Sequence, residues 1–215
     1  MISNNSSVHQ GFDQLLNAGR SLIVVQTVEE DRLEKILTAI GSARGQALWI
    51  WQANHGLTSP SGRIEGSQAA EDALAHLLRE QGAPPIVWMK DLHHHYRPEV
   101  VRSLRDLYYA WRHRDGAIVV SATERAVPLE LEREAAFLRM SLPDPEEIEA
   151  EVDAWSQQQA YDLQLSPQVV SATLRGLTRS EILHGLARIR ADNVAGQAAL
   201  TALQEEKRQI GRAHV

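Results

Sequence analysis

The sequence predicts an α/β fold in which a parallel sheet flanked by helices is followed by a small C-terminal helical lid. Two observations predict it. Over residues 1–143, short apolar runs alternate with amphipathic helical stretches, as in a sheet wrapped by helices. Over residues 144–215 the strand signal disappears and only helical patterns remain. We therefore expect an α/β subdomain over 1–143 and a helical lid subdomain with the C-terminal helix over 144–215.

Five apolar runs have the pattern of buried strands. The first, Ser21–Thr27, is rich in β-branched residues, and the third, Ile86–Lys90, follows two prolines. The helical crossovers between the runs are long enough for right-handed βαβ units, which predicts parallel strands. Residues 54–67 are rich in Gly, Ser and Pro and predict a loop. The expected strands are 21–27, 46–53, 86–90, 117–122 and 137–141.

Helices are predicted between the strands and throughout the second subdomain. Glu29–Ala43 has its leucines and isoleucines at helical spacing. Helix starts are indicated by Asp144 and Ser166, each followed by proline, and by Thr178 three residues before a glutamate. The expected helices are 29–43, 68–81, 98–113, a short piece at 128–134, 144–159, 166–174, 180–191 and 195–212.

Composition excludes several classes of protein. The chain has 215 residues and a formal net charge of −6, which opposes a general attraction to nucleic acid or anionic lipid. It has no cysteine, which excludes disulfides, thiolate catalysis and sulfur-bound zinc. No apolar run approaches the roughly 20 residues of a membrane span. Met1–Gln10 lacks the basic start and apolar stretch of a signal peptide. We expect a cytoplasmic protein with no membrane partner.

The order of elements is that of a P-loop-like sheet of the AAA+ type, yet the P-loop itself is missing. Its glycines, Lys and Ser or Thr would have to lie between the first strand and its helix. That segment, Val25–Arg32, reads VQTVEEDR. Glu29, Glu30 and Asp31 would meet a triphosphate at a helix N-terminus, where an anion is otherwise favoured. We therefore expect no cofactor and no ATPase activity, with ATP and Mg²⁺ as the alternative.

Three residues stand where P-loop enzymes hold their nucleotide and metal. Lys90 and Asp91 follow the third strand, in place of the two carboxylates expected there. Ser121 ends the fourth strand, where a water-positioning polar residue usually lies. We regard all three as vestigial and predict no catalytic residue. In the simpler interpretation Asp91 only caps the strand end.

Six segments carry a specific family resemblance along almost the whole chain. They read LIVVQTVEEDRLEKIL, IVWMKDLHHH, VVRSLRDLYYAWR, PLELEREAAFLRMSLPDPEEI, GLTRSEILHGLARI and EEKRQI. They resemble the N-terminal, nucleotide-site-degenerate domain of the AAA ATPases first named as a hypothetical chloroplast reading frame, from cyanobacteria, other bacteria and plastids. Thr27, Glu29, Glu30, Arg32 and segment 142–147 are the most distinctive positions.

The resemblance implies a fold and a supporting role rather than an ATPase activity. In that family the degenerate domain precedes a complete AAA+ module, and photosynthetic members are associated with regulation of photosynthesis and carbon uptake. This sequence stops at Val215, about where the resemblance expects the linker to the active module.

Two smaller features suggest further sites. Arg133 lies close to where AAA+ subunits present an arginine finger to a neighbour, a role that needs no nucleotide site of its own. An arginine paired with a nearby glutamate is the alternative. We expect no metal, since adjacent side chains of the triplet at 93–95 diverge; His93 and His95 are the candidates if a loop gathers them.

The helix over 98–113 has a basic face made of Arg102, Arg105, Tyr109 and Arg112. Such a face can contact phosphates, dock an acidic partner, or simply be solvated.

The leading hypothesis is a non-catalytic domain for regulation, oligomerisation or partner binding. Its partners would be AAA+ ATPase subunits or further copies of the chain. One alternative is a nucleotide-binding protein or weak ATPase without a P-loop. Another is nucleic-acid binding through the arginine-rich face.

Overall fold

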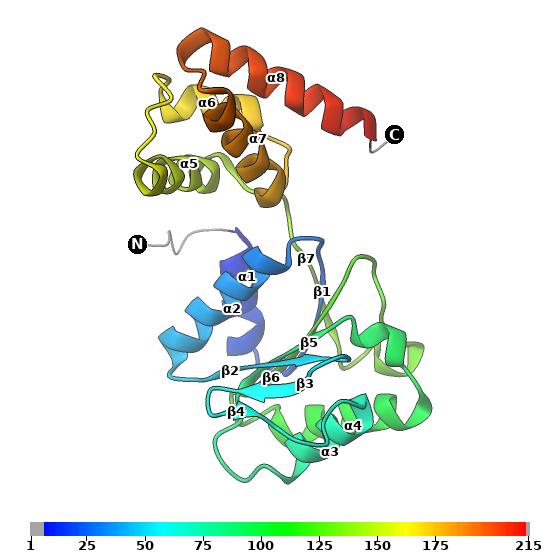
Figure 1. Cartoon of the computed structure of the whole chain (residues 1–215). Helices are drawn as coiled ribbons and strands as arrows, with labels where there is room; N and C mark the ends of the chain where they lie inside the picture. The colour runs from blue at the N-terminus through cyan, green and yellow to red at the C-terminus, as the bar shows by residue number, and fades with distance from the viewer. Residues whose placement is uncertain (1–6, 214–215) are drawn as a thin grey trace. The chain divides into compact units, whose positions relative to one another are not determined.

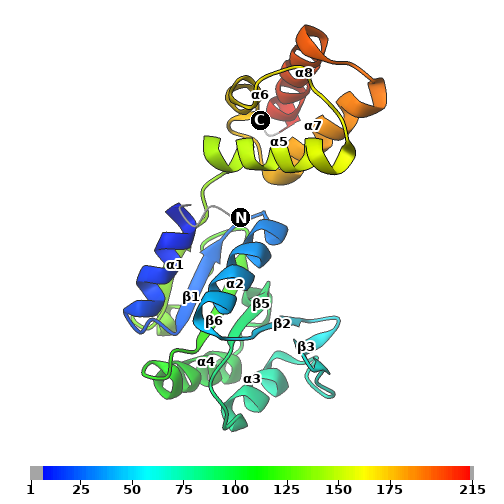
Figure 2. The same cartoon turned by 90° about the vertical axis from the view of Figure 1, so that its left-hand side faces the viewer.

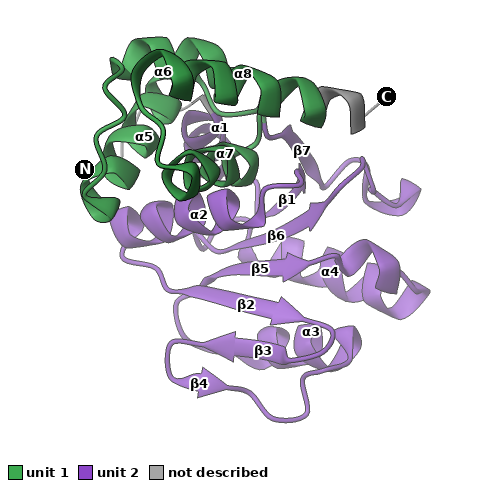
Figure 3. Cartoon of the chain, turned by 45° about the horizontal axis from the view of Figure 1, so that its top comes forward, with its two compact units in different colours: residues 1–6, 141–215 green, residues 7–140 purple. Residues whose placement is uncertain are grey.

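The computed structural model describes residues 7–213, which divide into two compact units (Figure 3). Residues 7–140 form an α/β unit, and residues 141–213 form a helical unit. Figure 1 follows the chain through both. None of the described helices is both long and apolar enough to cross a membrane.

A seven-stranded sheet forms the centre of the α/β unit, in the order β4-β3-β2-β5-β6-β1-β7. The strands β2, β5, β6, β1 and β7 run parallel, as the sequence predicts, and β6 lies between β1 and β5. This mostly parallel sheet is of the AAA+ type. The strands are β1 (Leu22–Gln26), β2 (Leu48–Gln52), β3 (Gly56–Ser59), β4 (Gly62–Arg63), β5 (Ile86–Lys90), β6 (Ala117–Ala122) and β7 (Ala136–Arg139).

The prediction of a loop over 54–67 is wrong, because β3 and β4 form an antiparallel hairpin there at the edge of the sheet. Gly56 and Gly62 have φ values of 78° and 120°, a region that favours glycine. Leu57 is fully buried, and its N–H donates to Ser67 Oγ at 2.8 Å. The Gly, Ser and Pro residues of segment 54–67 therefore indicate its turns. The strands form because the backbone of β3 pairs with β2 and with β4.

Helices cover both faces of the sheet (Figure 2). On one face α1 and α2 pack on residues such as Ile23, Val25 and Trp88. On the other, α3 and α4 pack on Val24 and Met89. The helix α1, over Ser7–Asn17, was not predicted. The helical elements are α1 (Ser7–Asn17), α2 (Glu30–Arg44), α3 (Ala70–Arg79), α4 (Pro98–Trp111) and the short 3₁₀ turns η1 (Leu92–His95) and η2 (Leu129–Leu131).

The helical unit contains α5 (Pro145–Gln159), α6 (Pro167–Leu174), α7 (Arg179–Asp192) and α8 (Gly196–Ala213). The predicted helix starts are confirmed. Asp144 and Thr178 each form a capping box, and the Ser166 side chain accepts from the N–H of Val169. Each such cap stabilises its helix by about 1 kcal/mol. The four helices enclose a core of their own that includes Trp155 and Leu186.

Candidate functional site

The candidate site lies at the carboxyl ends of the central parallel strands, where open α/β sheets bind their ligands. Strands β1, β5 and β6 are neighbours in the sheet. The N–H of Thr27 donates to Ala122 O at 2.9 Å, and the N–H of Asp91 donates to Ser121 O at 3.1 Å. The ends of the three strands are therefore held together, and the residues that follow them share one edge.

The connection between β1 and α2 is short and self-contained. Only Thr27, Val28 and Glu29 join the two elements. Thr27 Oγ1 accepts a hydrogen bond from the N–H of Glu29 at 2.9 Å. A P-loop needs roughly eight residues, with glycines, to wrap a phosphate. This connection has neither the length nor the glycines.

A buried ion pair follows directly. Glu29 and Arg32 are 8% and 6% exposed, and Glu29 Oε2 lies 3.1 Å from Arg32 Nη1. Sequence reasoning treated the Glu29 carboxylate as one that an incoming phosphate would meet. In the structure this carboxylate turns inward and pairs with Arg32. The two groups are buried together because burying either charge without the other would cost several kcal/mol.

Lys90 links the end of β5 to the start of α2. Its Nζ lies 2.9 Å from Glu30 Oε2 and 4.1 Å from the centre of the Trp88 ring. The next residue, Asp91, is exposed and has a left-handed φ of 51°. Its carbonyl accepts from the N–H of His94 at 3.1 Å, so Asp91 turns the chain from β5 into η1.

The Ser121 hydroxyl contacts the Trp88 side chain, an interaction that the sequence does not predict. Its Oγ accepts a hydrogen bond from Trp88 Nε1 at 2.9 Å, and both residues are buried. A tryptophan inside an apolar strand signals such a partner, because a buried indole N–H needs an acceptor. The structure thus brings Lys90 and Ser121 together around Trp88, with Asp91 beside them.

The basic face of α4 is largely paired within the chain. Arg102 forms an ion pair with Asp106, one helical turn away. Arg105 Nε lies 3.4 Å from Glu134 Oε1. Neutralised guanidinium groups attract a phosphate backbone less than free ones.

The remaining residues of that face are also engaged. Tyr109 OH lies 3.4 Å from Glu134 Oε1, and the Arg112 guanidinium lies 5.1 Å from the centre of the Tyr109 ring. Arg133 is exposed and makes no ion pair within residues 7–213, although its carbonyl accepts from Arg20 Nη1 at 3.5 Å.

The histidine triplet is divided between two environments. The rings of His93 and His94 lie 3.9 Å apart, whereas the His95 ring meets Trp51 edge-on at 5.4 Å. Within the described part of the chain, no three His, Asp or Glu side chains are grouped so as to hold a metal ion.

His93 makes folding stability depend on pH. Burial, with a smaller contribution from His94, lowers the pKa of His93 from its usual value of 6.5. Between the lowered pKa and 6.5 the unfolded chain binds more protons, so stability rises with pH across that window and this contribution is level above and below it. We expect His93→Gln to flatten this slope in urea denaturation between about pH 5 and pH 7.5. An exposed control, His113→Gln, should retain the slope, and an unchanged slope in the His93 variant would contradict the assignment.

Comparison with known proteins finds a matching family and a similar protein. Residues 8–140 match the family described as the SpoVK-like AAA ATPase N-terminal domain. The chain is also similar to an uncharacterized AAA domain-containing protein, ycf46, from Guillardia theta, with 27% identity over 205 residues. That match covers 93% of this chain and 40% of the relative, so the chain spans two fifths of the relative's length.

Proposed function

Because the chain belongs to the SpoVK-like AAA ATPase N-terminal domain family, we propose that it is a non-catalytic domain that binds and regulates a partner. The partner would be an AAA+ ATPase module or a further copy of the chain. Two observations support the proposal. The sheet is of the AAA+ type, and the connection between β1 and α2 is not a phosphate-binding loop.

The single observation that carries the proposal is how the β1–α2 connection uses its charges. Glu29 is paired with buried Arg32, and Glu30 is paired with Lys90. A phosphate placed at the start of α2 would lie beside three carboxylates, Glu29, Glu30 and Asp31, in and before the first turn of the helix. The edge is therefore stabilised without a ligand.

Two observations support an AAA+ ATPase as the partner, namely the relatives of the chain and one exposed arginine. The Guillardia theta relative is an AAA domain-containing protein that is longer than this chain. Arg133 is exposed and unpaired within residues 7–213, so it is available to an adjoining subunit. An arginine offered in this way can stabilise phosphoryl-transfer charge in a neighbour's site.

A nucleotide titration tests the absence of a functional phosphate site. We expect no binding of a fluorescent ATP analogue with Mg²⁺ up to about 1 mM, the weak end of measurable affinities. Asp91→Ala is the control, because Asp91 is an exposed carboxylate that directly follows β5. Micromolar binding that is lost in Asp91→Ala would contradict the proposal and favour an ATPase without a P-loop.

A second experiment tests the regulatory role itself. Removing residues 7–140 from the ATPase assembly that contains this domain should change its ATPase rate or its state of assembly. Arg133→Ala should reproduce the part of the effect that depends on a trans-acting arginine. Unchanged rate and assembly after the deletion would refute the proposal.

A further inference from the structure

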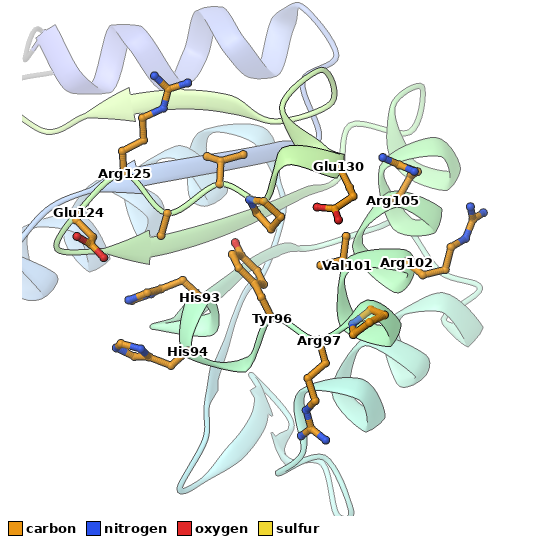
Figure 4. Close-up of a pocket in the computed structure, with 14 residues that line it drawn as sticks. His93, His94, Tyr96, Arg97, Val101, Arg102, Arg105, Glu124, Arg125 and Glu130 are labelled. Atoms are coloured by element: carbon orange, nitrogen blue, oxygen red, sulfur yellow. The ribbon is translucent and has the colours of Figure 1, made fainter.

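A cavity of about 800 Å³ lies beyond the carboxyl ends of β5 and β6 (Figure 4). Its walls come from η1, the first turns of α4 and the segment between β6 and η2. This volume is in the range of sites that hold small ligands or single side chains. Much of the lining is apolar or aromatic, including Tyr96, Pro98, Val101, Val127 and Pro128.

Four arginines also line the cavity, yet each guanidinium is engaged elsewhere. Arg97 lies 3.6 Å from Glu71, and Arg102 is paired with Asp106. Figure 4 shows both side chains extending outward from the cavity.

The other two arginines contact a carboxylate and an aromatic ring. Arg105 pairs with Glu134 at 3.4 Å, and Arg125 lies 5.2 Å from the centre of the Phe137 ring. A count of lining arginines would predict an anion site, but three of the four guanidinium groups already have a carboxylate partner.

The polar groups of the cavity without a hydrogen-bond or ion-pair partner in the described part of the chain include two carboxylates, the Tyr96 hydroxyl and Nδ1 of His93. Glu124 and Glu130 form no ion pair with any residue from 7 to 213, and the Tyr96 hydroxyl makes no hydrogen bond in that range. In Figure 4 the Glu130 carboxylate and the Tyr96 hydroxyl are directed to the middle of the cavity. Glu124 lies on the side of His93.

The charges of the surroundings agree with this arrangement. Three of the four lining arginines are paired with Glu71, Asp106 and Glu134, whereas the two lining glutamates form no ion pair within residues 7–213. Burial also lowers the pKa of His93, which keeps its imidazole neutral near pH 7. The lining charges without an ion-pair partner among the described residues are therefore two carboxylates and one guanidinium, that of Arg125.

We propose that this cavity binds a lysine or arginine side chain of a partner protein. The aliphatic stem would pack on Val101, Val127 and the prolines, as long cationic side chains do on apolar surfaces. The charged head would lie over the Tyr96 ring and pair with Glu130, combining a cation–π contact with an ion pair. That the cation comes from a protein rests on the proposed partner-binding function, whereas the site rests on the cavity alone.

Fluorescein-labelled tetralysine is the probe, measured by anisotropy at low salt with the full chain. We expect saturable binding that weakens about fivefold in Glu130→Gln, the loss of one charge pair at an exposed carboxylate. The matched control is Glu132→Gln, which removes the same charge from an exposed neighbour outside the cavity and should change affinity less than twofold. Tetralysine acetylated on every amine should not bind.

Three results would overturn the inference. Equal weakening in Glu130→Gln and Glu132→Gln would mean general attraction to an acidic protein. Binding of pyrophosphate that is lost in Arg125→Gln would assign the cavity to anions. Tighter binding of spermidine than of tetralysine would assign it to free polyamines. The nucleotide titration fails or succeeds independently of all three, so the two proposals can be refuted separately.

Discussion

Replacing Arg32 with alanine is expected to lower the free energy of unfolding by about 3–5 kcal/mol. The Glu29 carboxylate, only 8% exposed, would then lose the guanidinium that lies 3.1 Å from it. A buried charge that loses so close a counter-charge incurs one of the larger single-residue penalties in proteins. Urea denaturation followed by tryptophan fluorescence measures the loss.

Two further variants distinguish this pair from an ordinary salt bridge. Lys90→Met removes the partner of Glu30, which is 43% exposed, and should cost only about 0–1 kcal/mol. The double variant Glu29→Gln with Arg32→Met should recover much of the loss, because no isolated charge remains. A cost below about 1 kcal/mol for Arg32→Ala would mean that the pair is solvated and that the β1–α2 connection is open to a ligand.

The sheet could be predicted because its evidence is local. A β-branched run such as Ser21–Thr27 favours a buried strand, and the helical crossovers between such runs favour parallel pairing. The hairpin over β3 and β4 could not be predicted in this way. Its strands are two to four residues long and depend on pairing with β2, so only their turn residues leave a mark in the sequence.

The candidate site was predictable in location but not in its pairings. The missing glycines in Val25–Arg32 are visible in the sequence, as are the acidic residues that replace them. The Glu29–Arg32 pair is local, three residues apart, whereas the Glu30–Lys90 pair depends on β5 lying near α2, a contact 60 residues apart. The cavity beside η1 is further from prediction still, because its residues come from two separate segments, 93–105 and 124–130.

The second large effect is expected at Trp88, the residue around which Lys90 and Ser121 are arranged. Trp88→Ala should lower the free energy of unfolding by about 3–5 kcal/mol, since it empties the volume of a fully buried indole. Trp155→Ala removes a tryptophan from the separate core of the helical unit, and its effect should be confined to that unit. A loss at Trp88 comparable to a surface substitution would contradict the packing described.

The same position decides between two roles for Ser121. If its hydroxyl serves as the acceptor for the indole N–H, Ser121→Ala should cost about 1–3 kcal/mol by leaving that donor unsatisfied. In a double-mutant cycle with Trp88→Phe, the coupling energy should then be about 0.5–1.5 kcal/mol. If Ser121 instead positioned a water for hydrolysis, the coupling would be near zero and a basal ATPase activity would fall in Ser121→Ala. Because the hydroxyl already accepts a hydrogen bond inside the core, we expect the first result.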